Sequence, residues 1–369
     1  MKRVILAVTN DISHDQRVAK VCNSLKNIGY EVVLVGRLLR SSKPLERDYQ
    51  THRIKLLFNK GFLFYAEFNF RLFFWLLFKK SSVYHSNDLD TLLAMWIVAK
   101  INRKPIVYDS HEYFTGVPEI KNRPFVKWFW EGIEGNIFPK LKYVFTVNES
   151  ISNLYYESYG IRAEVLRNLP LKKSITKTKS REELGLPLNK KVVILQGAGI
   201  NIDRGAEELL EAVSIQKSFF LCIVGKGDIV QDLKKRAQRP DLIDKVIFID
   251  SLPYQQMMEY TLNSDVGVSL DKPNNLNYLY SLPNKIFDYF KAGIPVISSD
   301  LIEINKIISE FNAGVLIENH QPKSILNALS HVLDDKNYET YKKFASKVID
   351  QLNWETESQV LLNCYNNIE

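Results

Sequence analysis

The sequence predicts an α/β protein of two domains, each built on a parallel β-sheet with helices on both faces. Short apolar runs rich in Val, Ile and Leu alternate with longer amphipathic stretches along the whole chain, a pattern typical of parallel sheets that are covered on both sides. The length of 369 residues favours about two domains. A polar segment without helical periodicity, residues 172–180, interrupts the alternation near the middle of the chain. We therefore expect the domain boundary there.

The predicted strands form two sets of six. In the first half they are residues 3–9, 31–35, 83–85, 105–108, 143–147 and 163–166. In the second half they are residues 191–196, 219–224, 245–249, 266–270, 295–298 and 314–317. The expected organisation is a first domain over 1–171, a linker over 172–180, a second domain over 181–350 and a C-terminal helix over 351–369. This last helix contains Trp354 and is expected to dock back onto the body of the protein.

The composition excludes several classes of protein. Hydrophobic residues make up 46% of the chain and charged residues 25%, which excludes wholesale disorder, collagen-like repeats and a membrane bundle. The three cysteines, Cys22, Cys222 and Cys364, are far apart and form no Cys-x-x-Cys pair, so we expect neither a disulfide scaffold nor a cysteine-based zinc site. The apolar run at residues 4–8 is too short for a signal peptide. We therefore expect a cytoplasmic protein.

The charge is unevenly distributed between the two halves. Residues 1–179 carry 29 Lys and Arg against 16 Asp and Glu, a net charge of +13, whereas residues 180–369 carry 20 against 26, a net charge of −6. A basic half favours an anionic partner such as a membrane surface, a phosphorylated lipid or nucleic acid. Because the sequence has no recognition helix, zinc finger or aromatic RNA-binding pattern, we do not expect nucleic acid. An anionic membrane surface remains as a partner.

Two glycine loops follow predicted strands of the second half. Gly197 and Gly199 come directly after the strand 191–196, and Arg204 stands at the start of the next predicted helix. Glycines let the backbone approach an anion, and a helix start offers free N–H groups. Since a cation is disfavoured at a helix N-terminus, Arg204 is best explained by a shared anion. Gly225 lies in the loop after the following strand. Plain turns remain the alternative, because neither loop has a complete dinucleotide or P-loop motif.

The most informative segment is YSLPNKIFDYFKAGIPVI, residues 280–297. Pro283 suits the first position of a helix, which places Asn284, Lys285 and Asp288 in its first two turns. Asn284 and Lys285 at a helix start suit a diphosphate. The carboxylate of Asp288, one turn further on, can accept hydrogen bonds from the two hydroxyls of a ribose. The alternative is an acid favoured by the helix dipole beside a solvated lysine.

The pattern P-N-K-x-F-D-Y-x-x-A-G-x-P-V-I resembles the donor-binding motif of the retaining glycosyltransferases of family 4. This resemblance implies the GT-B fold, two Rossmann-like domains that face a central cleft. It implies that Asp288 binds the ribose of a sugar nucleotide and that Arg204-Gly205 contacts the pyrophosphate. The first acid of the family motif falls at Tyr280, and the arginine that often follows the first loop glycine is here Ala198. The contacts to the donor sugar therefore stay open.

Polar clusters follow three predicted strands of the first half, at the edge where open parallel sheets bind ligands. The acceptor-binding candidates are Asp11, Arg17, His85, Asp88, Asp109, His111 and Glu112. The segment D-x-H-E at 109–112 resembles that of a bacterial subgroup of family 4, which implies that His111 lies close to the reacting carbon. The catalytic candidates are His111, Arg204 and Lys285.

A metal site is the alternative explanation of the polar clusters in the first half. His14, His85 and His111 could join Asp11, Asp88 or Asp109 as ligands. The sequence has no i, i+4 histidine pair. We therefore expect no metal and no cofactor besides the sugar nucleotide, which is a substrate.

Residues 62–78 form an unusual aromatic stretch, FLFYAEFNFRLFFWLLF, with Lys60, Lys79 and Lys80 on either side. It carries charges and is shorter than the roughly 20 apolar residues that span a bilayer. Two interpretations stay open. The stretch is a helix packed on the sheet, or an interfacial helix whose aromatics reach the headgroup region while its basic flanks contact anionic lipid.

Together these features predict a hexosyltransferase that moves a sugar from a nucleoside diphosphate to a lipid-linked or cell-surface glycan precursor. Family resemblance implies retention of anomeric configuration. No residue is a convincing carboxylate nucleophile, which favours front-side displacement without a metal. The enzyme would serve polysaccharide or cell-envelope synthesis at the inner face of the cytoplasmic membrane. The alternatives are a nucleotide-sugar epimerase of the same fold and a non-catalytic nucleotide-sugar-binding subunit, which the missing acid at Tyr280 keeps open.

Overall fold

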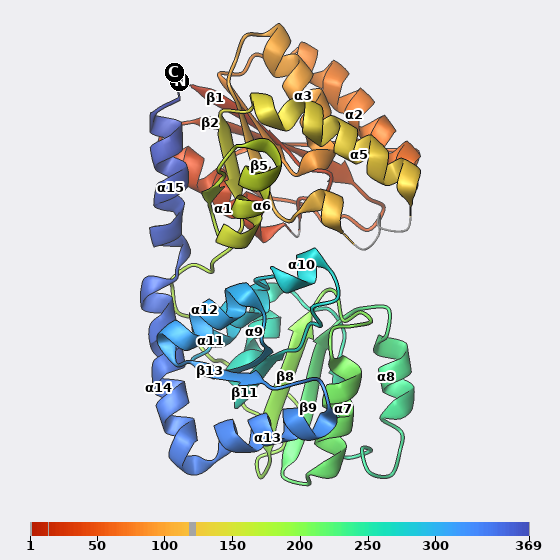
Figure 1. Cartoon of the computed structure of the whole chain (residues 1–369), viewed down its shortest axis with the longest axis vertical. Coiled ribbons are helices and arrows are strands. Elements are labelled where there is room, and N and C mark those ends of the chain that lie inside the picture. The colour runs from red at the N-terminus through yellow and green to blue at the C-terminus, as the bar shows by residue number, and fades with distance from the viewer. Residues whose placement is uncertain (1, 14, 118–122, 369) are drawn as a thin grey trace. The chain divides into compact units, whose positions relative to one another are not determined.

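The computed structural model describes residues 2–13, 15–117 and 123–368 (Figure 1). The chain forms two compact units, Met1–Asn168 together with Glu357–Glu369, and Leu169–Thr356. Each unit is a parallel β-sheet between layers of helices. Within the described residues, no helix has both the length and the apolar character needed to cross a bilayer.

The first unit contains a seven-stranded sheet in the order β3-β2-β1-β4-β5-β6-β7. Its strands are β1 (Arg3–Ala7), β2 (Glu31–Leu38), β3 (Gln50–Lys55), β4 (Val83–Asn87), β5 (Ile106–Ser110), β6 (Tyr143–Thr146) and β7 (Glu164–Val165). Its helices are α1 (Gln16–Asn27), α2 (Gly61–Leu77), α3 (Leu89–Ile101), α5 (Pro124–Ile137) and α6 (Glu149–Tyr159), with short 3₁₀ turns η1 (Phe114–Gly116) and η2 (Phe138–Lys140). The strand order reverses between β1 and β4, which creates a crevice at their carboxyl ends.

The second unit contains a six-stranded sheet in the order β10-β9-β8-β11-β12-β13. Its strands are β8 (Lys191–Gly197), β9 (Phe219–Gly225), β10 (Val246–Ile249), β11 (Val266–Ser269), β12 (Val296–Ser299) and β13 (Gly314–Ile317). Its helices are α7 (Ala206–Ile215), α8 (Val230–Arg236), α9 (Tyr254–Leu262), α10 (Leu276–Leu279), α11 (Asn284–Lys291), α12 (Ile302–Phe311), α13 (Pro322–Leu333) and α14 (Asp335–Gln351). Here the strand order reverses between β8 and β11.

Successive residues of β8 build both cores of the second unit. Val193 and Leu195 pack in one apolar cluster with α7 and α13, whereas Val192 and Ile194 pack in another with α11 and α12. This alternation follows from the two-residue repeat of a strand. The sheet is therefore buried on both faces, and its carboxyl edge is left for polar groups.

The last helix, α15 (Trp354–Asn366), packs its C-terminal part on the first unit. The Tyr365 hydroxyl lies 2.7 Å from His85 Nδ1, and the Tyr30 hydroxyl donates to the Tyr365 carbonyl at 3.1 Å. Arg167 and Glu357 form an ion pair with an N···O distance of 2.7 Å. The expected docking of the C-terminal helix is thus confirmed.

The two-domain α/β fold predicted from the sequence is confirmed, and all twelve predicted strands overlap observed ones. One observed strand was not predicted: β3, an edge strand with the sequence QTHRIK. Because β3 pairs on one side only and most of its side chains are not buried, it lacks the apolar run that marks the other strands. The three cysteines are buried and free.

Candidate active site

Asp109, at the carboxyl end of β5, anchors the polar cluster of the first unit. Its side chain is fully buried, and its two oxygens accept from Arg17 Nη2 at 2.6 Å and from Arg17 Nε at 3.1 Å. Arg17 Nη1 donates to the Leu166 carbonyl at 2.8 Å. Burial alone would raise the pKa of Asp109, but Arg17 and His111 outweigh it and hold that pKa well below the usual range. Arg17 therefore fixes Asp109, and direct contact of Arg17 with an acceptor stays a prediction.

His111 lies between two carboxylates. Its Nδ1 is 3.1 Å from Asp88 Oδ2, and its Nε2 is 3.4 Å from Asp109 Oδ2. Burial disfavours the charged ring, but Asp88 and Asp109 outweigh this effect and raise the pKa of His111 to about 10. The ring is therefore an imidazolium at neutral pH, with each ring nitrogen near a carboxylate oxygen. In this state His111 can supply positive charge, but it cannot accept a proton.

Asp88 connects β4 to α3 in a strained backbone conformation. Its φ is +59°, in the left-handed region that a non-glycine residue seldom adopts. The Asp88 backbone N–H donates to the Asp109 carbonyl at 2.9 Å, and its carboxylate accepts from the His111 backbone N–H at 2.8 Å. Such strain costs about 1–3 kcal/mol and persists where the surroundings enforce it, often at a functional site.

Asp90, in the first turn of α3, was not among the candidates predicted from the sequence. Asp90 Oδ2 accepts from the Thr9 hydroxyl at 2.5 Å, and its buried Oδ1 has no hydrogen-bond partner in the described part of the chain. Burial, aided by the negative charge of Asp88, raises the pKa of Asp90 to about 8. A neutral carboxylic acid at this edge can donate as well as accept a hydrogen bond. The only sequence signal was its place two residues after Asp88.

The other acceptor candidates lie around this cluster in different environments. Asp11 accepts from the Ser13 hydroxyl at 2.8 Å and from the Ser42 hydroxyl at 2.7 Å, so it joins the loops after β1 and β2. Glu112 is exposed. His85 is fully buried, and burial lowers its pKa to about 4, so its ring is neutral. His85 Nε2 lies 4.0 Å from Asp109 Oδ2.

The histidine-based metal alternative receives no support from the described side chains. They contain no group of three or more His, Cys, Asp or Glu residues that could hold a metal ion. His14, one ligand in that alternative, lies outside the described residues.

Arg204, Asp271 and Lys285 form the charged cluster of the second unit. Arg204 Nη1 lies 3.2 Å from Asp271 Oδ2, and the guanidinium stands 4.7 Å from the centre of the Tyr278 ring. Burial lowers the pKa of Lys285, whereas the negative charge of Asp271 opposes this shift and Arg204 adds to it. Asp271 and Tyr278 were not among the residues predicted from the sequence. Asp271 could have been noticed, since it follows the predicted strand 266–270 directly.

Glycines allow the loop after β8 and the loop after β9 to form hydrogen bonds with each other. Lys226 N–H donates to the Gly197 carbonyl at 3.2 Å, and Ile200 N–H donates to the Lys226 carbonyl at 3.0 Å. Gly225 has a φ of +140°, and a Cβ there would clash with the Gly197 carbonyl oxygen. Gly225 thus has a structural reason to be glycine. Gly199 lies in the other loop, between the end of β8 and the start of α7.

The predicted helix after Pro283 is α11, and Pro283 is its N-cap residue. No described side chain caps the start of α11 or of α7, so their first N–H groups are available to an anion. Asn284 is exposed at this start. Asp288, one turn later, accepts from the Tyr254 hydroxyl at 2.8 Å and from Gln196 Nε2 at 3.3 Å. Asp288 therefore lies beside the end of β8, within a hydrogen-bonded network.

Comparison with known proteins gives the family. Residues 16–170 match the model of Glycosyltransferase Family 4, and residues 176–350 match that of Glycosyl transferases group 1. The chain belongs to glycosyltransferase family 4. This glycosyltransferase is 23% identical over 364 residues to chitobiosyldiphosphodolichol beta-mannosyltransferase of Yarrowia lipolytica, with 86% of this chain and 77% of that protein covered.

Solved structures show the fold of the glycosyltransferase. Sucrose-phosphate synthase from Thermosynechococcus elongatus is similar with a TM-score of 0.80 and 17% identity, covering 99% of this chain and 98% of that one. Anabaena Alr3699/HepE in complex with UDP-glucose is similar with a TM-score of 0.77 and 15% identity over the whole of both chains. The GT-B fold predicted from the sequence is therefore confirmed.

In this family 4 glycosyltransferase the two sheet edges have different chemistry. The edge of the first unit presents carboxyl groups and one imidazolium, which suit hydroxyl-bearing molecules. The edge of the second unit presents Arg204 and Lys285 against Asp271, a net charge of +1, beside two uncapped helix starts. Such an edge suits an anion of two or more charges.

Proposed function

We propose that this enzyme transfers a hexose from a nucleoside-diphosphate sugar to an acceptor hydroxyl, with the donor bound at the edge of the second unit. The observation that carries the donor assignment is the cluster of Arg204, Lys285 and Asp271 where the strand order reverses between β8 and β11. Ligands of open α/β sheets bind at such reversals. HepE, whose fold is similar, was solved in complex with UDP-glucose.

Within the donor, we assign the diphosphate to Arg204, Lys285, Asn284 and the loop of Gly197 and Gly199. Its charge would be met by two cations and two helix starts, so no divalent ion is needed. The ribose is assigned to Asp288, whose carboxylate already accepts from Tyr254 and Gln196. An acceptor-only group of this kind can bind the two ribose hydroxyls through charge-assisted hydrogen bonds.

We propose retention through a front-side displacement. The bond from the anomeric carbon to the diphosphate oxygen breaks while the bond to the acceptor oxygen forms on the same face. The acceptor proton passes to the departing diphosphate. Asp88 and Asp109 are the carboxylates nearest His111, and each is held by it, which argues against either as a free nucleophile. His111 would contribute positive charge at this edge, and Asp90 a hydrogen bond to the acceptor.

The acceptor is proposed to be lipid-linked, a precursor of a cell-surface glycan, and the enzyme to act at the inner face of the cytoplasmic membrane. Two observations support this proposal. The relative from Yarrowia is named for a diphosphodolichol substrate. In the first unit, α2 carries exposed phenylalanines beside the net positive charge of that half of the chain.

A panel of nucleotide sugars and nucleoside diphosphates, screened by thermal shift, tests the donor assignment because a bound ligand stabilises the folded state. Turnover of the donor that binds is then followed with lipid-linked acceptors, and the anomeric configuration of the product is read by NMR. Conversion of the donor without any acceptor would instead indicate an epimerase. Binding without turnover on every acceptor would indicate a non-catalytic subunit.

A further inference from the structure

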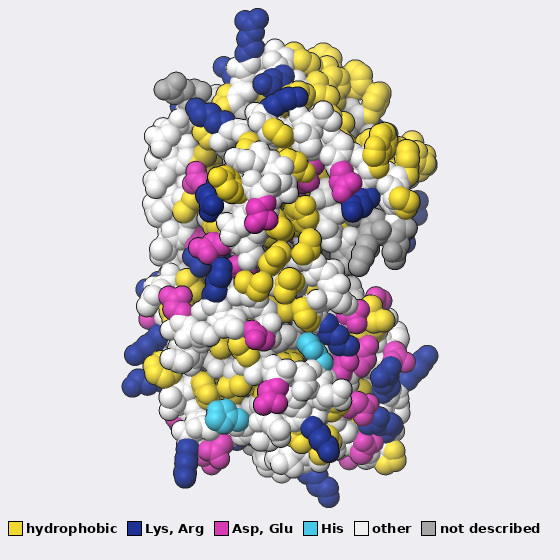
Figure 2. Space-filling view, viewed as in Figure 1, with side chains coloured by type: hydrophobic (Ala, Val, Ile, Leu, Met, Phe, Trp, Pro, Cys, Tyr) yellow, Lys and Arg dark blue, Asp and Glu magenta, His cyan; other side chains and the backbone are white. Residues whose placement is uncertain are grey.

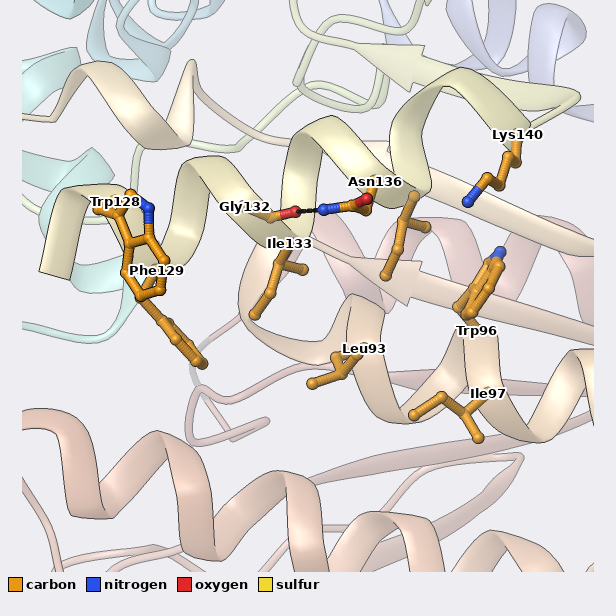
Figure 3. A pocket seen from close by; sticks show the side chains of 10 residues that line it. Leu93, Trp96, Ile97, Trp128, Phe129, Gly132, Ile133, Asn136 and Lys140 are labelled. Atoms are coloured by element: carbon orange, nitrogen blue, oxygen red, sulfur yellow. Dashed lines mark hydrogen bonds between the residues drawn. The ribbon is translucent and has the colours of Figure 1, made fainter. Parts of the chain in front are cut away.

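An apolar groove lies between α3 and α5 and extends to α2, whose side chains line its other end. It consists of two hollows, of about 340 and 310 Å³, that share Leu93, Ile97, Phe129 and Ile133. Because they share these walls, we treat them as one groove and call it the α3–α5 groove. Figure 3 shows Trp128 and Phe129 toward one end of the first hollow, and Trp96 and Lys140 at the other.

The surface around the groove is apolar on the side that faces away from the sheet. On α2, Phe64 and Phe68 are buried against the core, yet Phe70 is 64% exposed. On α5, Phe125 and Trp128 are 68% and 67% exposed. Hydrophobic side chains gather over α2 and α5 in the space-filling view (Figure 2). A helix that is apolar on all faces needs a second apolar partner, and a patch of this kind marks an interaction site.

The Trp96 end of the groove carries cations without acids. Lys100 Nζ and Lys140 Nζ lie 5.7 and 5.8 Å from the centre of the Trp96 ring. The segments 91–108 and 135–148, which contain these two lysines, have no acidic residue. The charge at this end therefore complements an anion.

Asn69 lines the α2 end of the groove, and its side-chain amide is already satisfied. Asn69 Nδ2 donates to the Asp90 carbonyl at 2.7 Å and to the Tyr65 carbonyl at 3.0 Å, while Oδ1 accepts from Ala94 N–H at 3.3 Å. The groove thus has a cationic end and an apolar length. This is the pattern expected for an amphiphile with an anionic head and a hydrocarbon chain.

We propose that the α3–α5 groove binds one hydrocarbon chain of an anionic membrane phospholipid, whose phosphate lies between Lys100 and Lys140. This inference rests on the proposed function in placing the first unit against a membrane. The helix α3 has 13 residues, about 20 Å of length at 1.5 Å per residue. Since Asp88 precedes its start and Lys100 lies in its last turn, the bound phosphate is distant from the acceptor cluster. The lipid is therefore an anchor and is distinct from the acceptor.

Two glycines of α5 provide a matched pair of variants. Gly132 lines the groove, and Gly135 does not. A Cβ added at either position meets no atom within 4 Å, and Leu favours a helix more than Gly does. Gly132→Leu should therefore fold and fill the groove, whereas Gly135→Leu should fold and leave it open.

The probe is dodecyl phosphate below its micelle concentration, titrated into the full chain by calorimetry. We expect one molecule per chain, at least tenfold weaker binding to Gly132→Leu and unchanged binding to Gly135→Leu. The double variant Lys100→Ala/Lys140→Ala should bind dodecyl phosphate more weakly and bind dodecanol with unchanged affinity. The double variant Lys217→Ala/Lys235→Ala is the charge control. Vesicles of phosphatidylglycerol should bind the wild type and Gly135→Leu more strongly than Gly132→Leu.

Equal affinity in the two glycine variants would overturn the proposal. So would a wild-type dimer that Gly132→Leu separates, since the groove would then be an interface between copies of the chain. Nucleoside-diphosphate affinity, measured on the same samples, separates this test from that of the proposed function. If the wild type binds nucleoside diphosphate but no dodecyl phosphate, the groove proposal alone fails. If it binds dodecyl phosphate but no nucleoside diphosphate, the donor assignment alone fails.

Discussion

Asp271 holds Arg204 at the edge of the second sheet: its Oδ2 lies 3.2 Å from Arg204 Nη1, while its buried Oδ1 has no hydrogen-bond partner among the described residues. The carboxylate therefore neutralises one of two cations before any ligand arrives. Under the proposed function, an incoming diphosphate would have to share Arg204 with Asp271. Asp271 would then position Arg204 and also limit the affinity for the diphosphate.

We expect Asp271→Asn to bind nucleoside diphosphates more tightly and to turn over more slowly. Removal of the competing charge should strengthen binding about fivefold, or about 1 kcal/mol, while the looser Arg204 should lower turnover. The measurements are calorimetric affinity and turnover at saturating donor. Asp265→Asn is the control, because Asp265 pairs with Arg181 at 2.8 Å near the amino end of β11 and should change neither. Weaker diphosphate binding to Asp271→Asn would contradict the assigned role.

Asp288→Asn should raise the dissociation constant of the nucleoside diphosphate about 10- to 150-fold. The expected loss of about 1.5–3 kcal/mol is that of hydrogen bonds to a charged group. Tyr254→Phe is the control, since it removes the hydroxyl that donates to Asp288 and leaves the carboxylate in place. The ribose assignment fails if calorimetry gives the same affinity for Asp288→Asn and the wild type.

The sequence predicted where strands end, and hence which polar residues reach a sheet edge, because strand and helix periods are local. It did not predict which of these residues pair with each other. Arg17 and Asp109 lie 92 residues apart, and His85 meets Tyr365 across 280 residues. Such pairings depend on strand order, which no local pattern records. Asp90 was missed for a related reason: its burial beside Thr9 depends on β1 and β4 being neighbours in the sheet.

The raised pKa of Asp90 determines the direction in which stability changes with pH. In the folded protein this carboxyl keeps its proton up to about pH 8, whereas in the unfolded chain it ionises near pH 4. Between these values the folded state binds more protons, so the wild type loses stability as pH rises from about 4 to about 8. The loss is at most about 1.4 kcal/mol per pH unit.

Asp90→Asn removes this titration while it keeps a hydrogen-bonding group beside Thr9. Its unfolding free energy, measured by urea denaturation, should exceed that of the wild type by an amount that grows from pH 5 to pH 8. His111, whose pKa rises from 6.5 to about 10 on folding, also lowers stability above about pH 6.5, but this contribution is common to both proteins and cancels in their difference. A constant difference between the two proteins over these pH values would show that Asp90 is ionised when folded.

The outer face of α2 is expected to contact anionic membranes. Phe70, Phe74 and Phe78 are 64%, 45% and 83% exposed, so replacing them by Ser should release the protein from phosphatidylglycerol vesicles and leave its melting temperature nearly unchanged. Binding should also weaken as salt rises, because exposed charges are screened beyond about 8–10 Å. Phe68→Ser is the contrasting variant, since Phe68 is fully buried and its loss should destabilise the fold. Unaltered vesicle binding by the triple variant would rule out this face.

Arg204 and Lys285 are expected to act together on the leaving diphosphate. Breaking the sugar–phosphate bond adds negative charge to the diphosphate, and a group that feels this charge more in the transition state than in the ground state lowers the barrier. Both cations lie beside Asp271, so they would stabilise the same charge.

Each alanine variant should therefore lower turnover at saturating donor by about 10²–10³-fold, the effect of losing one preorganised donor. The double variant should lose less than the product of the two effects, because groups that act on one charge are not additive. Lys272→Ala is the control, since Lys272 pairs with Glu208 at 2.7 Å. If the single variants raise only the Michaelis constant, Arg204 and Lys285 bind the donor without stabilising the transition state, and this part of the mechanism fails.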